Sequence, residues 1–347
     1  YPLIDGVVNG CPSHLLEPAR TNLVTNSEDL SYFSKTNITE VNGNQVTPNG
    51  TIGSIKITPT SSAITQLQIS SLTIGASYSF SFFVKKAEAS HLIINQAGSA
   101  AQKISYDIGN LSYIGISGVD ANIVSYGNEW VRVEYSVNSL TYNNIRIILS
   151  DGSDNYPYNP PIGDGLYLWG FQLEQGSYPT SYIPTSGSAV TRVAETANGA
   201  GDASTFNDSE GVLMVEISAL VNIGSFENIS LSNGSSASRV FLFYRNSLNL
   251  MEFRVTVNNS IQMVFQHTIA DAKTSNKFAI KYKENDFAIW INGIEVHTDP
   301  NGITFGSFPL TNLSLDNGQV SAPTSPFYGS TKQIQYFDSA LNDSDLE

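Results

Sequence analysis

The sequence has one cysteine, few charged residues and no long apolar run, and each of these absences excludes a class of protein. A lone Cys11 in 347 residues allows no disulfide within the chain and no metal site built from several cysteines. A catalytic thiol needs a base, and only His14 lies near Cys11, so we interpret Cys11 as a small apolar or turn residue. No apolar stretch approaches the ~18 residues of a membrane-spanning helix.

Charged residues make up 14% of the chain, well below the ~25% of an average soluble protein. The 31 acidic residues outnumber the 17 basic ones, which gives a formal net charge of −14. Nucleic acid and anionic membranes are therefore disfavoured as partners, because both are bound through clustered Lys and Arg. This balance favours a neutral partner, or one that is bound through calcium.

What the sequence does have is period-two alternation of apolar and polar residues between turn signals. Seven stretches before residue 183 show it: 54–60, 63–72, 77–86, 91–96, 130–137, 144–150 and 165–176. Each is bounded by Gly, Asn, Asp, Ser or Pro, and no helical periodicity interrupts them. A series of short antiparallel strands of this kind predicts a β-sandwich or jelly roll.

A second strand series follows a small-residue segment that we interpret as a linker. Its stretches are 211–220, 239–245, 251–257, 261–267, 276–296, 311–317 and 331–347. Within it, turns are predicted at Glu284-Asn285-Asp286 and at Asn292-Gly293, because Asn-Gly tolerates positive φ. The sequence therefore predicts an all-β chain of two tandem antiparallel β-sandwich (jelly-roll) domains. The expected bounds are an extended N-terminal lead-in at 1–25, sandwiches at 26–190 and 209–347, and a linker at 191–208.

The second series resembles laminin-G-like, concanavalin-like jelly rolls. The resemblance is carried by "NKFAIKYKENDFAIWINGIEV" (276–296), which has the family's strand, turn, strand and Asn-Gly hairpin. The closing "QIQYFDSALNDSDLE" (333–347) resembles the family's last strand followed by a short helical turn.

The first part resembles modules of tail, fibre and other receptor-contacting proteins of bacteriophages and prophages. Two segments carry this resemblance, "GCPSHLLEPARTNLVTNSEDLSYFSK" (10–35) and "GLYLWGFQLEQGSYPTSYIPTSGSAVTRVAE" (165–195). In that family both segments flank a carbohydrate-binding-module-like sandwich. The resemblance implies a virion or surface adhesin that contacts bacterial glycans, and it assigns no binding residue.

Motifs that would indicate catalysis are missing. There is no metal-ligand spacing of histidines and no Gly-x-Ser-x-Gly turn. A glycosidase needs two carboxyl groups ~5–9.5 Å apart in a cleft, whereas Glu28 and Asp29 are adjacent and would point to opposite faces of a strand. We read that pair as a solvated turn or cap, and Glu216 and Glu252 as solvent-facing strand acids. The prediction is that the chain is not an enzyme.

One loop has the composition of a calcium site. "SDGSDNYPYNPPIGDG" (150–165) contains Asp151, Asp154, Asn155 and Asp164 between two strands, and calcium takes six to eight oxygen ligands of this type. The same residues are common in ordinary turns. No cofactor is required, and calcium is the one candidate.

Sugar binding would depend on exposed aromatic side chains that stack on pyranose rings. The candidates are Tyr156, Tyr158, Tyr178, Tyr182, Tyr244 and Trp290. Trp290 alternates with Phe287, Ile289 and Ile291, so it would face away from a core formed by those three. Core or interface packing is the alternative for every one of these aromatics.

Taken together, these features predict a non-enzymatic structural protein of a phage virion, such as a tail fibre, spike or head decoration, that adheres to host-surface glycans. The expected location is the virion, outside the cell. The expected partners are host polysaccharide and other virion proteins, in a homo-oligomer for which the resemblance favours a trimer. The alternative is a carbohydrate-binding region of a secreted bacterial polysaccharide-degrading enzyme, and a depolymerase is the least favoured reading.

The segment "LLEPARTNLVTNSEDLSYFSK" (15–35) is polar and irregular, unlike its surroundings. We predict that it forms a joint with "YIPTSGSAVTRVAE" (182–195), about 160 residues downstream. Glu17, Arg20 and Asn22 would satisfy backbone groups where the chain enters and leaves the first sandwich. Because the sequence opens on Tyr1 without a signal peptide, we expect a processed or excised piece of a larger protein.

Overall fold

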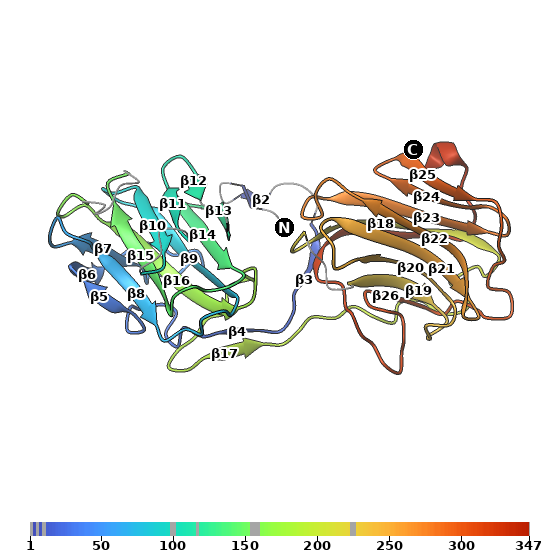
Figure 1. Cartoon of the computed structure of the whole chain (residues 1–347), viewed down its shortest axis with the longest axis horizontal. Helices are drawn as coiled ribbons and strands as arrows, with labels where there is room; N and C mark the ends of the chain where they lie inside the picture. The colour runs from blue at the N-terminus through green and yellow to red at the C-terminus, as the bar shows by residue number, and fades with distance from the viewer. Residues whose placement is uncertain are drawn as a thin grey trace. The chain divides into compact units, whose positions relative to one another are not determined.

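The computed structural model describes residues 3–4, 7–8, 12–97, 102–115, 118–152, 160–222 and 227–346 (Figure 1). The chain divides into two compact units, each considered by itself below. Unit 1 comprises Tyr1–Gly10 and Ala19–Val193, and unit 2 comprises Cys11–Pro18 and Ala194–Glu347. Over the described residues, no helix is long and apolar enough to cross a membrane.

Unit 1 is a sandwich of two six-stranded antiparallel sheets, in the orders β12-β11-β10-β15-β8-β5 and β13-β14-β9-β16-β7-β6 (Figure 1). The first sheet contains β5 (Ser34–Thr36), β8 (Gln66–Ser70), β10 (His91–Asn95), β11 (Ile104–Asp107), β12 (Ser112–Gly115) and β15 (Asn144–Ser150). The second contains β6 (Ile38–Asn42), β7 (Ile55–Pro59), β9 (Tyr78–Lys86), β13 (Val119–Gly127), β14 (Trp130–Val137) and β16 (Leu166–Gln175). Two short pairs, β1 (Leu3–Ile4) with β2 (Val7–Val8) and β4 (Arg20–Asn22) with β17 (Val190–Arg192), complete the unit.

Unit 2 is a sandwich of a six-stranded and a five-stranded antiparallel sheet, in the orders β25-β24-β23-β18-β27-β3 and β22-β21-β20-β19-β26. The six-stranded sheet contains β3 (His14–Leu16), β18 (Glu210–Ala219), β23 (Asn276–Lys283), β24 (Phe287–Ile291), β25 (Ile294–Asp299) and β27 (Gly329–Phe337). The five-stranded sheet contains β19 (Asn228–Ser232), β20 (Arg239–Tyr244), β21 (Leu250–Val257), β22 (Ser260–Thr268) and β26 (Asn312–Ser314). A 3-10 turn, η1 (Asp343–Asp345), lies near the C-terminus.

Each core lies between the two sheets of its unit and is formed by one alternate set of strand residues. In unit 1 the inward residues of β9 include Phe80, Phe82 and Val84, all at most 1% exposed. In unit 2 Val240 and Leu242 of β20 occupy the same kind of position. Burial of these side chains, at ~25 cal/mol per Å² of apolar surface, is the main stabilising contribution.

The all-β sandwich fold predicted from the alternation is confirmed. Both predicted hairpin turns are present: residues 284–286 join β23 to β24, and Asn292-Gly293 joins β24 to β25. Asn292 and Gly293 both have positive φ, 53° and 81°, as a tight hairpin of this type requires. The expected final strand and short helical turn correspond to β27 and η1.

The structure divides the chain at other residues than the domain bounds expected from the sequence. The expected lead-in, 1–25, is shared between the units, because β3 pairs with β27 of unit 2 whereas β4 pairs with β17 of unit 1. The expected linker, 191–208, carries β-type contacts of unit 2, such as the bridge between Ala200 and Leu313.

The predicted joint is present in unit 1 as the β4–β17 pair. Thr21 lies opposite Thr191, and the two hydroxyls are 2.8 Å apart. Asn22 is fully buried, and its amide nitrogen donates to the carbonyl oxygens of Phe171 and Ile183 at 3.0 and 2.8 Å. Its amide oxygen accepts hydrogen bonds from the backbone N–H groups of Val24 and Leu173. One side chain therefore ties the entering segment to β16 and to the segment that leaves the sandwich.

Glu17 and Arg20, the other two residues predicted for the joint, have different surroundings. Glu17 lies in unit 2, where its backbone N–H donates to the carboxylate of Glu195 at 2.9 Å and its carbonyl accepts from the Glu195 N–H at 3.0 Å. Arg20 lies in unit 1 and places its guanidinium carbon 5.0 Å from the centre of the Tyr178 ring.

Candidate functional site

Two of the tyrosines predicted to contact glycan, Tyr178 and Tyr182, pack against the joint of unit 1. Tyr178 lies under the guanidinium of Arg20. The Tyr182 hydroxyl is 2.7 Å from the hydroxyl of Ser27, and its ring packs on Trp169 at 4.8 Å between centroids. Burial raises the pKa of Tyr182. These contacts give both rings a packing role, and their predicted role in glycan binding stays a prediction.

Trp290 and Tyr244 are not on the surface, so the expectation that Trp290 is exposed is wrong. Trp290 does face away from the main core of unit 2, but it is only 1% exposed. Leu346, which follows η1, packs against it in a small second cluster, and the Lys281 ammonium lies 5.4 Å from its ring centre. Tyr244 points into the main core and is 2% exposed. Neither ring offers the free face that stacking on a sugar requires.

The remaining predicted ligands belong to the 150–165 loop. Tyr156, Tyr158, Asp154 and Asn155 lie outside the described residues, as does Cys11. Asp151 is exposed, and Asp164 follows a turn in which its N–H donates to the Pro161 carbonyl at 3.3 Å. Over the part of the chain that the structure describes, no group of three or more His, Cys, Asp or Glu side chains could hold a metal ion. Calcium binding by the whole loop stays a prediction.

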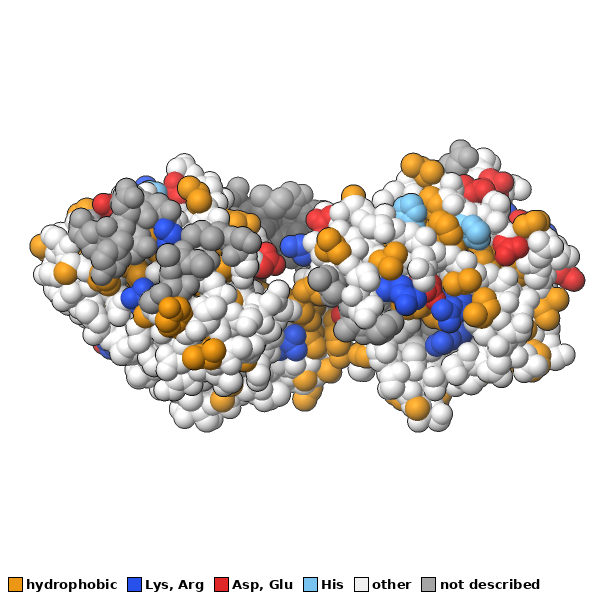
Figure 2. Space-filling view, in the orientation of Figure 1, with side chains coloured by type: hydrophobic (Ala, Val, Ile, Leu, Met, Phe, Trp, Pro, Cys, Tyr) orange, Lys and Arg blue, Asp and Glu red, His pale blue; other side chains and the backbone are white. Residues whose placement is uncertain are grey.

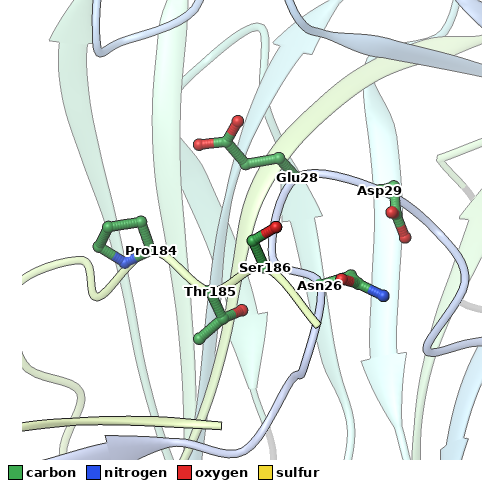
Figure 3. Close-up of a pocket in the computed structure, with 6 residues that line it drawn as sticks. All are labelled: Asn26, Glu28, Asp29, Pro184, Thr185 and Ser186. Carbon is green, nitrogen blue, oxygen red and sulfur yellow. The ribbon is translucent and has the colours of Figure 1, made fainter. Parts of the chain in front are cut away.

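A hollow of about 330 Å³ lies at the joint and contains the adjacent acids of the sequence (Figure 3). Figure 3 shows the carboxylates of Glu28 and Asp29 pointing away from each other, from a turn that faces Pro184, Thr185 and Ser186. Asp29 accepts a hydrogen bond from the backbone N–H of Ser31 at 2.7 Å, as a turn-capping residue does. The hollow therefore belongs to the joint, in keeping with the reading of this pair as a cap.

A second hollow of unit 1, of about 240 Å³, contains His91 and Asp107 on neighbouring strands. The Asp107 carboxylate accepts from the backbone N–H groups of Gly109 and Asn110 and from the Asn110 side chain, and it lies 3.4 Å from the His91 ring nitrogen. Although partial burial acts in the opposite direction, the hydrogen bonds from Asn110 lower the pKa of Asp107. These bonds use the acceptor positions of the carboxylate, so Asp107 acts as the cap of a turn.

The outer face of the five-stranded sheet in unit 2 carries a group of charged side chains, and we call it the arginine face. It consists of Arg239, Phe241, Phe243 and Arg245 along and just after β20, Glu252 and Arg254 on β21, and Gln266 on β22. Figure 2 shows basic side chains gathered over this sheet, with an acidic one between them. Three of the seven arginines in the chain lie here.

Alternation along β20 produces this face. Val240, Leu242 and Tyr244 point into the core, so Arg239, Phe241 and Phe243 point outward. The two phenylalanine rings are stacked, with centroids 5.4 Å apart and planes at 14°. They are only 3% and 7% exposed, because the arginines cover them.

Each guanidinium of the face lies against one of these rings. The guanidinium carbon is 4.0 Å from the Phe241 centre for Arg239 and 5.5 Å for Arg254. Arg245 lies 5.9 Å from the Phe243 centre. Cation–π contacts of this kind hold a guanidinium in place, at ~0.5–2 kcal/mol each.

Glu252 is the carboxylate at the centre of the face, and its predicted exposure to solvent is wrong. It is 0% exposed and forms ion pairs with Arg245 and Arg254. The side-chain amide of Gln266 donates a third bond to it at 2.6 Å. A buried carboxylate needs such partners, and Glu252 in turn fixes two of the three arginines.

Arg239 has no carboxylate partner among the described residues. Its one hydrogen bond runs from the guanidinium to the carbonyl oxygen of Asn317, at 2.6 Å. Burial, together with the positive charge of Arg254, lowers the pKa of Arg239. The fold thus keeps a half-buried cation beside a second cation, an arrangement that an anion would stabilise.

The sequence-based prediction missed this face, although "RVFLFYR" and "MEFRVTV" contain the signal. In both strands every second residue is of a type common in protein cores. The residues between them include Arg239, Arg245, Glu252 and Arg254. The search for exposed aromatic residues favoured Tyr244 and Trp290 instead. The arginines became visible as a group only when β20 and β21 were seen to pair in register, with Phe241 opposite Arg254.

No family model matches the chain, and no curated protein matches it either. Among solved structures, the chain is similar to the Ruminococcus gnavus IT-sialidase CBM40 bound to alpha2,3 sialyllactose, with 17% identity over 44% of this chain and 94% of that one, and a TM-score of 0.36. It is similar to a SAP-like pentraxin from Limulus polyphemus, with 11% identity, 40% and 67% coverage and a TM-score of 0.32. It is also similar to sheep Galectin-11, with 7% identity, 42% and 100% coverage and a TM-score of 0.28. Likenesses this distant support no conclusion about what this chain does.

Proposed function

We propose that this protein is a non-enzymatic structural component of a phage virion, a tail fibre, spike or head decoration, which adheres to glycans on the host surface. The observation that carries the glycan-binding part is the arginine face, where ordered N–H donors lie beside the exposed apolar side chains of Ile261 and Val264 on the neighbouring strand β22. Sugars combine hydroxyl groups with apolar C–H faces, so they suit a surface of this composition. The virion part rests on the two sequence segments that resemble phage receptor-contacting proteins.

Binding at such a face would be weak for a single site, because the face is open and holds few side chains. Several copies on one particle would raise the overall avidity, since each further contact is made at a high effective concentration. The proposed assembly is therefore a homo-oligomer, and a trimer is favoured. The proposed partners are host polysaccharide and other virion proteins.

The proposed activity is binding without cleavage. Glycoside hydrolysis needs one carboxyl group to donate a proton and a second one to act as nucleophile or base. Glu252 is shielded from solvent and held by two arginines and Gln266, so it is placed to organise the arginines rather than to exchange protons with a substrate.

A glycan array probed with the intact chain, with and without calcium, tests the adhesion. We expect binding to at least one bacterial glycan, and no release of reducing ends or unsaturated sugars from it. Binding that is lost when calcium is chelated would assign a role to the 150–165 loop. If no glycan is bound under either condition, the proposed adhesion is wrong and an architectural role replaces it.

Mass spectrometry of purified phage particles tests the location. Recovery of the chain from particles supports a virion component. Recovery from culture medium alone, joined to a catalytic region, would support the alternative of a binding region in a secreted polysaccharide-degrading enzyme.

A further inference from the structure

We infer that the arginine face selects acidic glycans and binds a sugar carboxylate between Arg239 and Arg254. This inference rests on the proposed function and adds the chemical class of the ligand. It also assigns two ligand-binding residues that the sequence did not indicate.

The charge balance of the face is the first argument. Among its described residues the face has three guanidinium groups and one carboxylate, Glu252, which pairs with Arg245 and Arg254. Arg239 is left with a carbonyl oxygen as its hydrogen-bond acceptor. In a chain with a net charge of −14, this face carries a local excess of positive charge, and a bound carboxylate would compensate it.

The free donors are the second argument. Across the described residues, Arg254 bonds only Glu252, and Arg239 bonds only the Asn317 carbonyl. A guanidinium has five N–H donors in a planar fork that matches a carboxylate. Each of these two side chains therefore keeps donors available for a ligand.

The spacing of the two guanidinium groups is the third argument. Both lie against the same ring, at 4.0 and 5.5 Å from the centre of Phe241. Their carbons are therefore less than about 10 Å apart, the most that two such distances from a common point allow. The ring of Phe241 holds both guanidinium groups, and Glu252 also holds that of Arg254, before a ligand binds. This preorganisation reduces the entropy cost of binding.

The neighbouring edge strand supplies a surface for the sugar ring. Val264 lies opposite Arg254, and Ile261 lies opposite Thr256 on the same face. Their side chains are 45% and 53% exposed. An acidic sugar has an apolar C–H face next to its carboxylate, so its ring would cover these two side chains while the carboxylate reaches the arginines.

The test uses the intact chain and the glycans that it binds on the array. Each acidic glycan is compared with its carboxyl-reduced form, in which the carboxylate becomes a neutral hydroxymethyl group. We expect carboxyl reduction to weaken binding at least tenfold, because charge-assisted hydrogen bonds contribute ~1.5–3 kcal/mol each. Arg239→Gln and Arg254→Lys should each weaken binding of the acidic form to a similar extent and leave the weak binding of the reduced form unchanged.

Lys277→Gln is the matched control, because it removes one positive charge from an exposed position on β23, in the other sheet of unit 2. We expect it to bind like the wild type, and melting temperatures report whether each variant is folded. Arg254→Lys retains the positive charge and its pairing with Glu252. Weaker binding by this variant would therefore report the loss of the planar guanidinium donors rather than unfolding of the protein.

Three outcomes would overturn the inference, and each differs from failure of the proposed function. Neutral glycans bound as tightly as acidic ones would exclude selection for a carboxylate while adhesion stands. Binding that is weakened by removal of sulfate or phosphate from the glycan, but not by carboxyl reduction, would mean that the face binds a different anion. Unchanged binding by folded Arg239→Gln and Arg254→Lys variants would place the site elsewhere. No binding to any glycan would instead contradict the adhesion itself.

Discussion

Glu227 and Glu252 are buried carboxylates of the same sandwich, and they differ in their hydrogen-bond and ion-pair partners. Glu252 has two arginines and an amide as partners. Glu227 is 5% exposed, and one of its carboxyl oxygens has no hydrogen-bond partner among the described residues. Burial raises the pKa of Glu227 to about 8, although a hydrogen bond from the Tyr328 backbone N–H acts in the other direction. Glu252 is therefore paired with cations, whereas Glu227 has no cationic partner among the described residues and is held in its protonated form near neutral pH.

Stability should consequently depend on pH through Glu227. Its pKa is raised in the folded state, so the folded protein keeps a proton that the unfolded chain loses above pH ~4.5. The free energy of unfolding should then fall as the pH rises from about 4.5 to about 8, by up to about 5 kcal/mol from this group. Glu227→Gln cannot ionise, so it should be more stable than the wild type at pH 8 and similar to it at pH 5, as measured by denaturant unfolding.

Glu284→Gln is the control for this experiment, because Glu284 is exposed. Its difference in stability from the wild type should stay small at both pH values. A difference between Glu227→Gln and the wild type that is the same at pH 5 and pH 8 would contradict the protonated state of Glu227.

Asn22 is a buried polar residue of unit 1 whose side chain bonds four backbone groups. Its four hydrogen bonds link β4 to β16 and to the segment that leaves the sandwich. Asn22→Ala would leave buried backbone groups unpaired, at ~1–3 kcal/mol each before water compensates. We expect a loss of about 3 kcal/mol or more in the free energy of unfolding of unit 1. Asn122→Ala, at an exposed position on β13, should cost less than about 0.5 kcal/mol, and equal costs for both would contradict this role.

At the scale of the elements, the joint formed by β4 and β17 was predictable because its two halves have unusual sequences. Arg20 belongs to the first half, and its guanidinium lies against the ring of Tyr178, which comes shortly before the second half. Arg20→Ala should lower the stability of unit 1 by about 1 kcal/mol, the size of a partly exposed cation–π contact. Glycan binding should remain unchanged, because the proposed site lies in unit 2. Thermal melting and the glycan array check the two parts, and lost binding at an unchanged melting temperature would contradict the structural role.

Strands with one apolar face were predicted well, and some strands at the sheet edges were missed. β9, β10 and β16 each begin and end within one residue of their expected bounds, because one of their faces is continuously apolar. β12 and β13 were missed, since β12 is exposed along its length and β13 alternates only between half-buried and exposed positions. Local alternation predicts a strand only when burial forces one face to be apolar.

The candidate site was less predictable, because which side of a strand meets solvent depends on distant parts of the chain. Trp290 is on the outer face of β24 as expected, but Leu346 comes from the C-terminal segment to cover it. Arg239 and Arg254 are 15 positions apart in sequence, and only the register of β20 with β21 places both on the ring of Phe241. Sequence periodicity contains no information about such coverage or pairing.

At the scale of the whole molecule, the proposed ligand and the protein carry charge of the same sign. The net charge of −14 repels an acidic polysaccharide at long range, whereas the arginine face attracts its carboxylate at contact. Salt screens interactions beyond the Debye length, which is ~10 Å at 0.1 M, far more than it screens a partly buried pair. Long-range repulsion should therefore weaken at a lower salt concentration than the arginine–carboxylate contact does.

We expect the association rate of the intact chain with an acidic glycan to rise as NaCl is increased from about 10 to about 100 mM, because long-range repulsion is screened first. The dissociation rate should change little over this range and increase only at higher salt, where the arginine–carboxylate contacts themselves weaken. Affinity would then pass through a maximum near physiological ionic strength. Surface plasmon resonance with the glycan immobilised measures both rates, and the carboxyl-reduced glycan, which is not repelled, should show no rise in association rate. An association rate that falls steadily with salt would mean that the positive field of the arginine face, rather than the net charge, dominates the approach of the ligand.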